Sequence, residues 1–418
     1  MARPMYVSVS DIQRDPDQTT VYNLKVNRRY VVEGCAGSGK SSLALLLLQK
    51  ILAEQGEDDS TPTPIYYVTT AHELVECVRQ QFSSFDSPPK YNDYAITGGK
   101  KGMWGSKKIT DLQRKKQNSK GRYVINSRVC MRHSYQRQWE VKTYNNEDIL
   151  INPKPDYLLI DEAQDFNREC IEDFMRSARK GCVFYGDDTQ CIMGFANPMH
   201  LSDIEMLLQA KYGQNDPTTG RVVVYRYKLK RNWRLSREIA AFAQSLPNGV
   251  ADPMLLQRCR GEYHEKPILA QMPNGNTDEI RKYMVEYIKK RVINRATIDD
   301  DVGIILRTND EVRSFYDNLK SMGNVSARYN IEGDEGCPDD YKYLRNTPVK
   351  IMTYENAKGQ QFRDVYLIGS DDILRDPEGL NRFYVGVTRA ERFLRIMYAG
   401  QLPTFLQNID PDLYETSE

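Results

Sequence analysis

The sequence contains few of the residues that build metal sites and disulfide frameworks. Its 418 residues include only 4 His, 3 Trp and 8 Cys. The cysteines form no C-x-x-C pair. The sequence therefore predicts neither a structural zinc site nor a disulfide scaffold, and a chain of this length does not need one.

Long apolar runs and an excess of either charge are also missing. The longest aliphatic run, residues 43–48, is far shorter than the roughly 20 residues that span a bilayer. The N-terminal stretch has no apolar core of a secretory signal. Lys and Arg number 58 against 57 Asp and Glu, and 40% of residues are hydrophobic, as in ordinary globular proteins. We expect a cytoplasmic protein of two or three domains, without a membrane partner.

Apolar strand patterns alternate with helical ones along most of the chain. Strands are predicted at residues 29–33, 65–68, 157–160, 182–185, 302–306, 349–352, 365–368 and 394–397. A helix is predicted at 41–52, directly after the first strand. Continuous apolar strands that end in acidic or Gly-rich loops indicate buried parallel sheets, which bind ligands at the carboxyl ends of their strands. We predict an α/β fold with domains at 1–246 and 247–418 and an insert in the first domain at about 84–152.

A phosphate-binding loop is predicted between the first strand and the helix after it. Gly34-Cys35-Ala36-Gly37-Ser38-Gly39-Lys40-Ser41 fits the pattern G-x-x-x-x-G-K-[ST]. The glycines let backbone N–H groups turn inward around phosphate oxygens at a helix N-terminus. Lys40 is then expected to reach the β- and γ-phosphates, and the Ser41 hydroxyl to bind Mg²⁺.

Two carboxylates follow a later apolar strand, Tyr157-Leu158-Leu159-Ile160. Most such pairs are solvated strand ends, but downstream of a phosphate loop they are expected to lie beside the phosphates. Asp161 is predicted to hold Mg²⁺, and Glu162 to orient and deprotonate the attacking water.

The run Asp161-Glu162-Ala163-Gln164-Asp165-Phe166, preceded by the phosphate loop, resembles the UvrD/Rep/PcrA-like branch of the superfamily 1 helicases. Further motifs follow in that family's order over about residues 15–400. The resemblance implies two RecA-like P-loop NTPase domains with parallel sheets, and ATP in the cleft between them. It also implies ATP and Mg²⁺ as cofactors, and an ATP hydrolase that acts on nucleic acid.

The resemblance assigns roles to single residues by motif. On the nucleotide, it implies that Gln18 reads adenine, Trp233 stacks on it, Gln190 senses the γ-phosphate, and Gly359 and Gln361 lie in a motif that contacts ribose. It implies that Arg234 and Arg389 stabilise the transferring phosphoryl group. On the nucleic acid, it implies contacts from Thr69 and Thr70. Gly194-Phe195 replaces the family's usual Trp-bearing segment, and Phe195 can still stack on a base.

Some of these residues also have simpler interpretations, and some positions differ from the family pattern. Gln18 is alternatively an ordinary surface residue, Trp233 and Phe195 are alternatively core aromatics, and the two arginines alternatively form surface ion pairs. Gln361 stands where the family usually has Glu, and Glu355 stands where His is common.

The insert is strongly basic between residues 100 and 137, where Asp111 is its single acidic residue. Lys107, Lys108 and Arg114 belong to this stretch, and Trp104, Tyr123 and Tyr135 are interleaved with the basic residues. A basic track with aromatic faces is typical of single-strand binding, so single-stranded nucleic acid is predicted as the partner, DNA more than RNA. The alternatives are a solvated loop or a partner-protein surface.

The interval from Arg234 to Val349 holds only about 115 residues, which leaves little room for the large second accessory subdomain of duplex-unwinding relatives. Two functions follow. The first is an ATP-dependent translocase or helicase that moves along single-stranded DNA, 3′→5′ by resemblance. The second is an ATP-gated regulatory or sensor subunit of a nuclease-containing complex, such as an anti-phage defence system, with little unwinding of its own.

Overall fold

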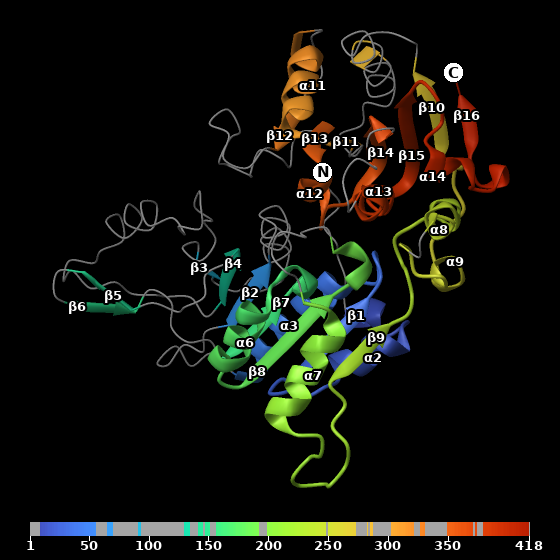
Figure 1. Cartoon of the computed structure of the whole chain (residues 1–418). Coiled ribbons are helices and arrows are strands. Elements are labelled where there is room, and N and C mark those ends of the chain that lie inside the picture. Colours follow the sequence, from blue (N-terminus) through green and yellow to red (C-terminus); the bar gives the residue numbers. More distant parts are fainter. Residues whose placement is uncertain are drawn as a thin grey trace. The chain divides into compact units, whose positions relative to one another are not determined.

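The computed structural model describes the protein in segments: 9–55, 65–69, 91–92, 129–133, 141–144, 147–150, 156–191, 199–247, 250–272, 282, 285–286, 302–321, 327–330, 349–370, 373 and 379–417. The chain divides into two compact units (Figure 1). One comprises Met5–Gly34 and Gly39–Lys230, and the other is chiefly Arg231–Glu418, with which Cys35–Ser38 is grouped. Each unit is built around its own sheet.

Among the described residues, the sheet of the first unit has seven strands in the order β3-β4-β2-β7-β8-β1-β9, and all of the pairings between them are parallel. These strands are β1 (Arg29–Gly34), β2 (Ile65–Thr69), β3 (Tyr91–Asn92), β4 (Val129–His133), β7 (Tyr157–Ile160), β8 (Gly181–Gly186) and β9 (Arg226–Leu229). A separate antiparallel pair consists of β5 (Val141–Tyr144) and β6 (Glu147–Leu150). The four strands predicted for the first domain are confirmed as β1, β2, β7 and β8.

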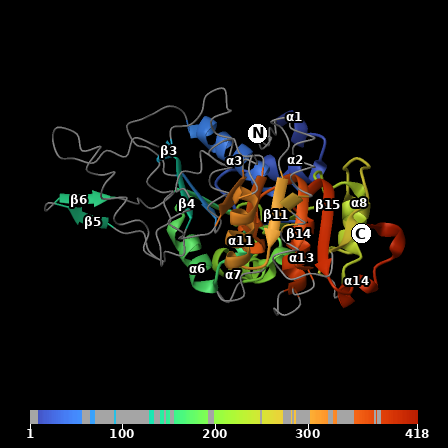
Figure 2. The ribbon, with the colours of Figure 1, turned by 90° about the horizontal axis from the view of Figure 1, so that it is seen from above.

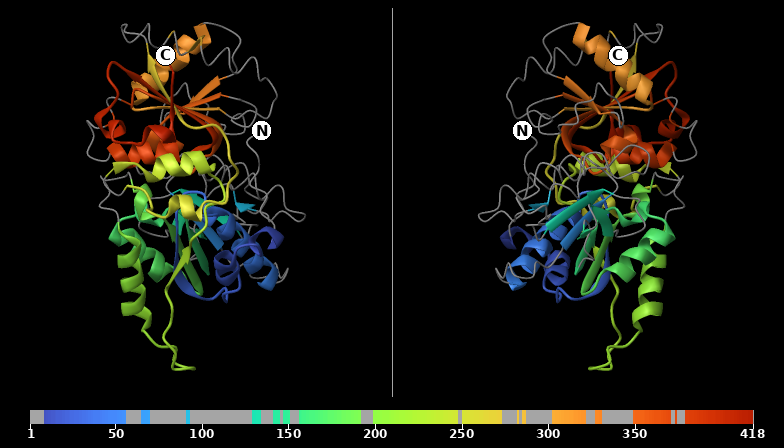
Figure 3. Two further views of the ribbon diagram at one scale, coloured as in Figure 1. Left: turned by 90° about the vertical axis from the view of Figure 1, so that its right-hand side faces the viewer. Right: turned by 90° about the vertical axis from the view of Figure 1, so that its left-hand side faces the viewer.

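Helices cover both faces of this sheet (Figure 3). One face carries α2 (Pro16–Tyr22) and α3 (Lys40–Gln55), and the other carries α6 (Arg168–Ser177) and α7 (Leu201–Tyr212). Side chains alternate between the two faces along a strand. In β1, Tyr30 and Val32 therefore join the core under α3, whereas Val31 joins the core under α6 and α7. The predicted helix after the first strand is confirmed as α3.

The second unit contains another seven-stranded parallel sheet, in the order β12-β13-β11-β14-β15-β10-β16. Its strands are β10 (Ile268–Met272), β11 (Val302–Leu306), β12 (Ala327–Asn330), β13 (Val349–Thr353), β14 (Phe362–Ile368), β15 (Ala390–Ala399) and β16 (Glu415–Ser417). The helix α11 (Asn309–Ser321) packs its buried residues on one face (Figure 2). On the other face lie α8 (Arg237–Gln244) and α13 (Gly379–Val387).

The α/β class with two parallel sheets is confirmed. The predicted domain boundary after residue 246 stays a prediction, and the contacts of α8 with β15 group that helix with the second sheet. Most of the predicted insert lies outside the described residues. Among the described helices, none is long and apolar enough to cross a membrane.

Candidate nucleotide-binding site

The loop between β1 and α3 has the backbone conformation that its glycines allow. Gly37 and Gly39 adopt φ angles of +74° and +86°, in the region that L side chains rarely occupy. A Cβ on Gly39 would also lie 2.7 Å from Gln18 Nε2, so a side chain there would both strain the backbone and displace the Gln18 amide. Ser38, between these glycines, is fully buried. The loop thus leads directly into the N-terminus of α3, where helix N–H groups favour anions.

Lys40 is the first residue of α3 and is almost completely buried. Its Nζ donates a hydrogen bond to the carbonyl oxygen of Gly34 over 2.6 Å, so the ammonium lies back across the loop. A phosphate in the loop would offer that ammonium a charged acceptor in place of a neutral one. The position agrees with the role predicted for Lys40.

Ser41 and Asp161 lie in direct contact although 120 positions separate them in the sequence. Ser41 Oγ donates to Asp161 Oδ2 over 2.6 Å, and the hydroxyl of Tyr67 donates to the same oxygen. The backbone N–H of Glu162 donates to Asp161 Oδ1 over 3.0 Å. The strand order explains how Tyr67 meets Asp161, because β7 lies beside β2 and the N–H of Asp161 bonds to the carbonyl of Val68.

Burial raises the pKa of Asp161, and the nearby charge of Glu162 raises it further. The hydrogen bonds from Ser41 and Tyr67 and the charge of Lys40 act in the opposite direction. The pKa of Tyr67 is also raised, first by burial and then by Asp161, so its hydroxyl stays protonated and acts as a donor.

These oxygen atoms fit a magnesium site. Mg²⁺ prefers hard oxygen ligands and usually takes one or two from the protein, with phosphates and water completing its shell. A hydroxyl and a carboxylate converge here beside the phosphate loop. No cluster of three or more His, Cys, Asp or Glu that could hold a metal occurs in the described part of the chain.

Glu162 has a left-handed backbone, with φ of 56° and ψ of 45°, and it is the one non-glycine residue with positive φ among those described. Its carboxylate Oε2 accepts a hydrogen bond from Gln164 Nε2 over 2.6 Å. Gln164 Oε1 in turn accepts from the backbone N–H of Asp187 over 3.0 Å. The side chain of Gln164, 1% exposed, thus connects Glu162 to the end of β8.

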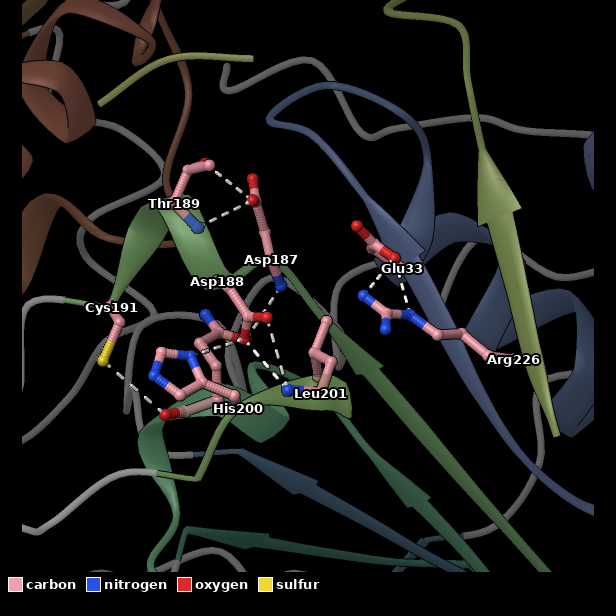
Figure 4. Close-up of polar contacts among 9 residues, drawn as sticks. Glu33, Asp187, Asp188, Thr189, Cys191, His200, Leu201 and Arg226 are labelled. Carbon is pink, nitrogen blue, oxygen red and sulfur yellow. Dashed lines mark hydrogen bonds and ion pairs between the residues drawn. The ribbon is translucent and has the colours of Figure 1, made fainter. Parts of the chain in front are cut away.

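Asp187 organises the turn after β8 (Figure 4). Its Oδ1 accepts from the N–H and the hydroxyl of Thr189, and its Oδ2 accepts from Gln190 Nε2 over 2.6 Å. Gln190 is 2% exposed, so its amide is held in one orientation inside the first unit. The predicted γ-phosphate sensor is therefore a positioned side chain, connected through Asp187 and Gln164 to Glu162.

A helix-start contact and an ion pair hold the surroundings of this turn (Figure 4). Asp188 accepts the N–H of Leu201 over 3.1 Å at the start of α7 and lies 3.8 Å from His200 Nδ1. Partial burial raises the pKa of Asp188. Glu33, which precedes the phosphate loop, pairs with Arg226 of the neighbouring β9 over 2.6 Å. These contacts anchor the strand ends from which the loop and the turn begin.

Gln18 lies in the first turn of α2. Asp15 precedes this helix, and its side chain accepts the N–H groups of Asp17 and Gln18. The Gln18 side chain is 6% exposed and lies against Gly39. The interpretation of Gln18 as an ordinary surface residue is therefore wrong, and its amide lies at the phosphate loop.

The Asn232-Trp233-Arg234 segment contacts Ala36 and Gly37, which are grouped with it in the second unit. Fully buried Asn232 donates to the carbonyl of Ala36, and its Oδ1 accepts the N–H groups of Arg234 and Leu235 over 3.0 Å each. The N–H of Trp233 donates to the carbonyl of Gly37 over 2.9 Å. The Trp233 side chain is 41% exposed, so it is not a core aromatic.

Arg234 and Arg389 meet at Thr388 within the second unit. One Nη of Arg234 donates to the Thr388 carbonyl, and Arg389 Nη2 donates to the Thr388 hydroxyl over 3.2 Å. Arg389, 2% exposed, also donates to the carbonyls of Val385 and Gln360. Neither arginine is a simple surface ion pair.

The predicted ribose motif lies between β13 and β14. Gly359 has a φ of +79°, and Gln361 is partly buried just before β14. Glu355, at the position where the family often has His, pairs with Arg382 over 2.8 Å.

The predicted nucleic-acid contacts cannot be placed. Thr70, Phe195, Lys107, Lys108 and Arg114 lie outside the described residues, and Thr69 is described only as the last residue of β2. Their roles stay predictions.

Sequence reasoning gave no role to Tyr67, Gln164 or Asp187. Gln164 lies in the run Asp161–Phe166 and Asp187 in the run Gly186–Gln190, and both runs resemble helicase motifs, so their position was a signal for a site role. Tyr67 begins the run Tyr67-Val68-Thr69-Thr70, which resembles a strand-end motif for nucleic-acid contact, so its position in the sequence pointed to a different role from the contact with Asp161.

No protein-family model matches the sequence, and no curated protein does. Solved structures that are similar include the C-terminal domain of a possible DNA helicase from Lactobacillus plantarum WCFS1, at 18% identity and a TM-score of 0.33, covering 44% of this chain and 99% of that one. The PRRSV helicase matches at 10% identity and a TM-score of 0.41, over 92% of this chain and 54% of that one. The Arterivirus nonstructural protein 10 (helicase) in complex with DNA matches at 13% identity and a TM-score of 0.41, over 91% of this chain and 62% of that one. The chain thus spans little more than half the length of these two helicases.

Proposed function

We propose that the protein is a nucleic-acid-stimulated ATPase of the UvrD-like helicase type, which uses ATP hydrolysis to move 3′→5′ along single-stranded DNA. The observation that carries the proposal is the contact between Ser41 and Asp161 beside the phosphate loop, with Glu162 held by Gln164. These are the groups that phosphoryl transfer requires, and they converge from positions that are far apart in the sequence.

In this proposal, bound Mg²⁺·ATP supplies the phosphoryl group and neutralises part of its charge. Lys40 leaves the Gly34 carbonyl to pair with the phosphates, and Ser41 and Asp161 provide oxygen ligands to the metal. Glu162 accepts a proton from the attacking water, and Gln190 responds to the γ-phosphate.

The remaining predicted residues complete the proposal. Gln18 reads adenine and the exposed face of Trp233 stacks on it, while Gly359 and Gln361 contact ribose. Arg234 and Arg389 stabilise charge on the transferring group. The strand is bound by Thr69, Thr70, Phe195 and the basic residues Lys107, Lys108 and Arg114.

Steady-state ATPase activity tests the proposal, measured alone, with single-stranded DNA and with single-stranded RNA. Glu162→Gln serves as the blank, because it keeps nucleotide binding and loses turnover. Strong stimulation by DNA is expected, and a tailed-duplex displacement assay then gives the polarity. ATP hydrolysis at one rate with and without either polymer would rule out the translocase.

The second candidate is an ATP-gated regulatory or sensor subunit of a nuclease-containing complex. The observation that favours it lies between Arg234 and Val349, where every described strand belongs to the second seven-stranded sheet. The described part of this interval therefore builds the core rather than a duplex-engaging subdomain. Stable co-purification with a nuclease whose activity changes with ATP would support this candidate, and strong unwinding by the isolated protein would contradict it.

A further inference from the structure

Tyr67 occupies a position in the first unit that links its core to the proposed metal site. It is the third residue of β2, is fully buried, and belongs to the core under α3. Its strand neighbour in the parallel register is Leu159, two residues before Asp161. The ring therefore points toward the face that α3 covers, and its hydroxyl reaches the carboxylate at the end of β7.

The hydroxyl groups of Tyr67 and Ser41 both donate to Asp161 Oδ2, while Asp161 Oδ1 accepts the N–H of Glu162. A carboxylate on a short side chain rotates readily unless its oxygens are held. Ser41 Oγ carries lone pairs that can bind a metal, whereas the Tyr67 hydroxyl lies inside the core. Tyr67 is thus a donor to Asp161 that comes from outside the phosphate loop.

The core itself does not require this hydroxyl to be hydrogen-bonded. Tyr30 and Tyr185 lie in the same core cluster and are equally buried, and their hydroxyls have no hydrogen-bond partner among the described residues. A phenylalanine at position 67 would fill the same space. The contact of Tyr67 with Asp161 is therefore more specific than general core packing demands.

We propose that Tyr67 is a positioning residue for the divalent cation of the nucleotide site, and that its hydroxyl fixes the Asp161 carboxylate in the orientation that binds Mg²⁺ beside Ser41. This proposal rests on the proposed function only as far as Mg²⁺-dependent nucleotide binding. Groups that orient metal ligands typically change metal affinity about 10–100-fold when they are removed.

The test compares Tyr67→Phe with the matched control Tyr30→Phe, which removes a hydroxyl from the same core. Binding of Mn²⁺ in the presence of ADP is followed by the loss of the free-ion electron paramagnetic resonance signal, and Mg²⁺ is titrated against binding of a fluorescent ADP. For Tyr67→Phe we expect about a ten-fold higher metal concentration at half-saturation, with metal-free ADP binding unchanged. Tyr30→Phe should match the wild type.

Thermal unfolding of both variants without metal separates positioning from stability. An unchanged metal requirement in Tyr67→Phe would overturn the proposal, as would an equal shift in Tyr30→Phe. Neither metal measurement requires turnover. A protein that binds metal and ADP but shows no polymer-stimulated hydrolysis would therefore contradict the proposed function while still deciding the role of Tyr67.

Discussion

Gln164 donates its side-chain amide to the carboxylate of Glu162 over 2.6 Å. The same side chain accepts the backbone N–H of Asp187, so one buried glutamine orients the proposed general base against the turn that carries Gln190. A carboxylate that must accept a proton from one water molecule benefits from a fixed orientation. This relationship leads to the first two predictions.

Gln164→Ala should lower kcat for ATP hydrolysis by about ten-fold or more, because a hydrogen bond to a charged group contributes about 1.5–3 kcal/mol. KM for ATP should change little, since the hydrogen bonds of the Gln164 side chain go to Glu162 and Asp187. Steady-state kinetics at saturating nucleic acid would measure both constants. A raised KM with normal kcat would show that Gln164 acts on binding instead.

Gly186→Ala should produce a similar loss of turnover, because the added methyl group would displace the Gln164 side chain. A Cβ at this position would lie 2.6 Å from Gln164 Oε1 and 2.7 Å from Leu201 Cδ2, so the glutamine must move. Overpacking of this kind costs about 1–3 kcal/mol of stability, which urea unfolding would measure. If displacement of Gln164 is the cause, the loss of turnover should be smaller when Gly186→Ala is added to Gln164→Ala.

Glu162→Gly should separate the effect of the Glu162 backbone conformation on stability from the effect of its carboxylate on turnover. A left-handed conformation costs a non-glycine residue about 1–2 kcal/mol, and glycine avoids that cost. The variant is therefore expected to unfold at the same temperature as Glu162→Gln or a higher one, while both lose turnover. A clear drop in the melting temperature of Glu162→Gly would contradict the strain argument, and calorimetry on the metal-free protein would reveal it.

Asp161 should make the metal-free protein less stable as the pH rises. Burial raises its pKa in the folded state, so its favourable contribution is complete below the unfolded-state pKa and is lost as the pH increases through the folded-state pKa. Wild type should therefore lose stability relative to Asp161→Asn as the pH rises above about 4, the ordinary value for an Asp carboxyl group. Urea unfolding of both proteins in chelator would measure this difference, and a constant difference across that range would contradict it.

The sequence predicted the interior of both sheets better than their edges. The strands β1, β7, β8 and β11 are continuous apolar runs because neighbours cover both their sides and faces. The edge strands β9 and β16 contain charged residues and have one neighbour each, so no apolar pattern marked them.

The site divides in a similar way. Local motifs predicted the phosphate loop, Asp161 and Glu162, because their spacing is a property of short segments. Tyr67 could not be predicted, since its role depends on β2 lying beside β7, and strand order is set by non-local packing. Gln18 and Trp233 needed the structure too, because only burial separated their site roles from the simpler interpretations.

Asn232→Ala should destabilise the protein and weaken nucleotide binding together. The side chain of Asn232 is fully buried and satisfies three backbone groups, the carbonyl of Ala36 and the N–H groups of Arg234 and Leu235. Leaving buried backbone groups without partners costs about 1–3 kcal/mol each, although water entering the space would recover part of this. We expect a loss of about 2–4 kcal/mol in the free energy of unfolding measured with urea, with a raised Kd for ADP, because Ala36 lies in the phosphate loop.

Asn232→Asp is the matched variant: it keeps the two N–H contacts and loses the donor to Ala36. Equal ADP affinity in Asn232→Asp and wild type would show that the Ala36 contact does not hold the loop.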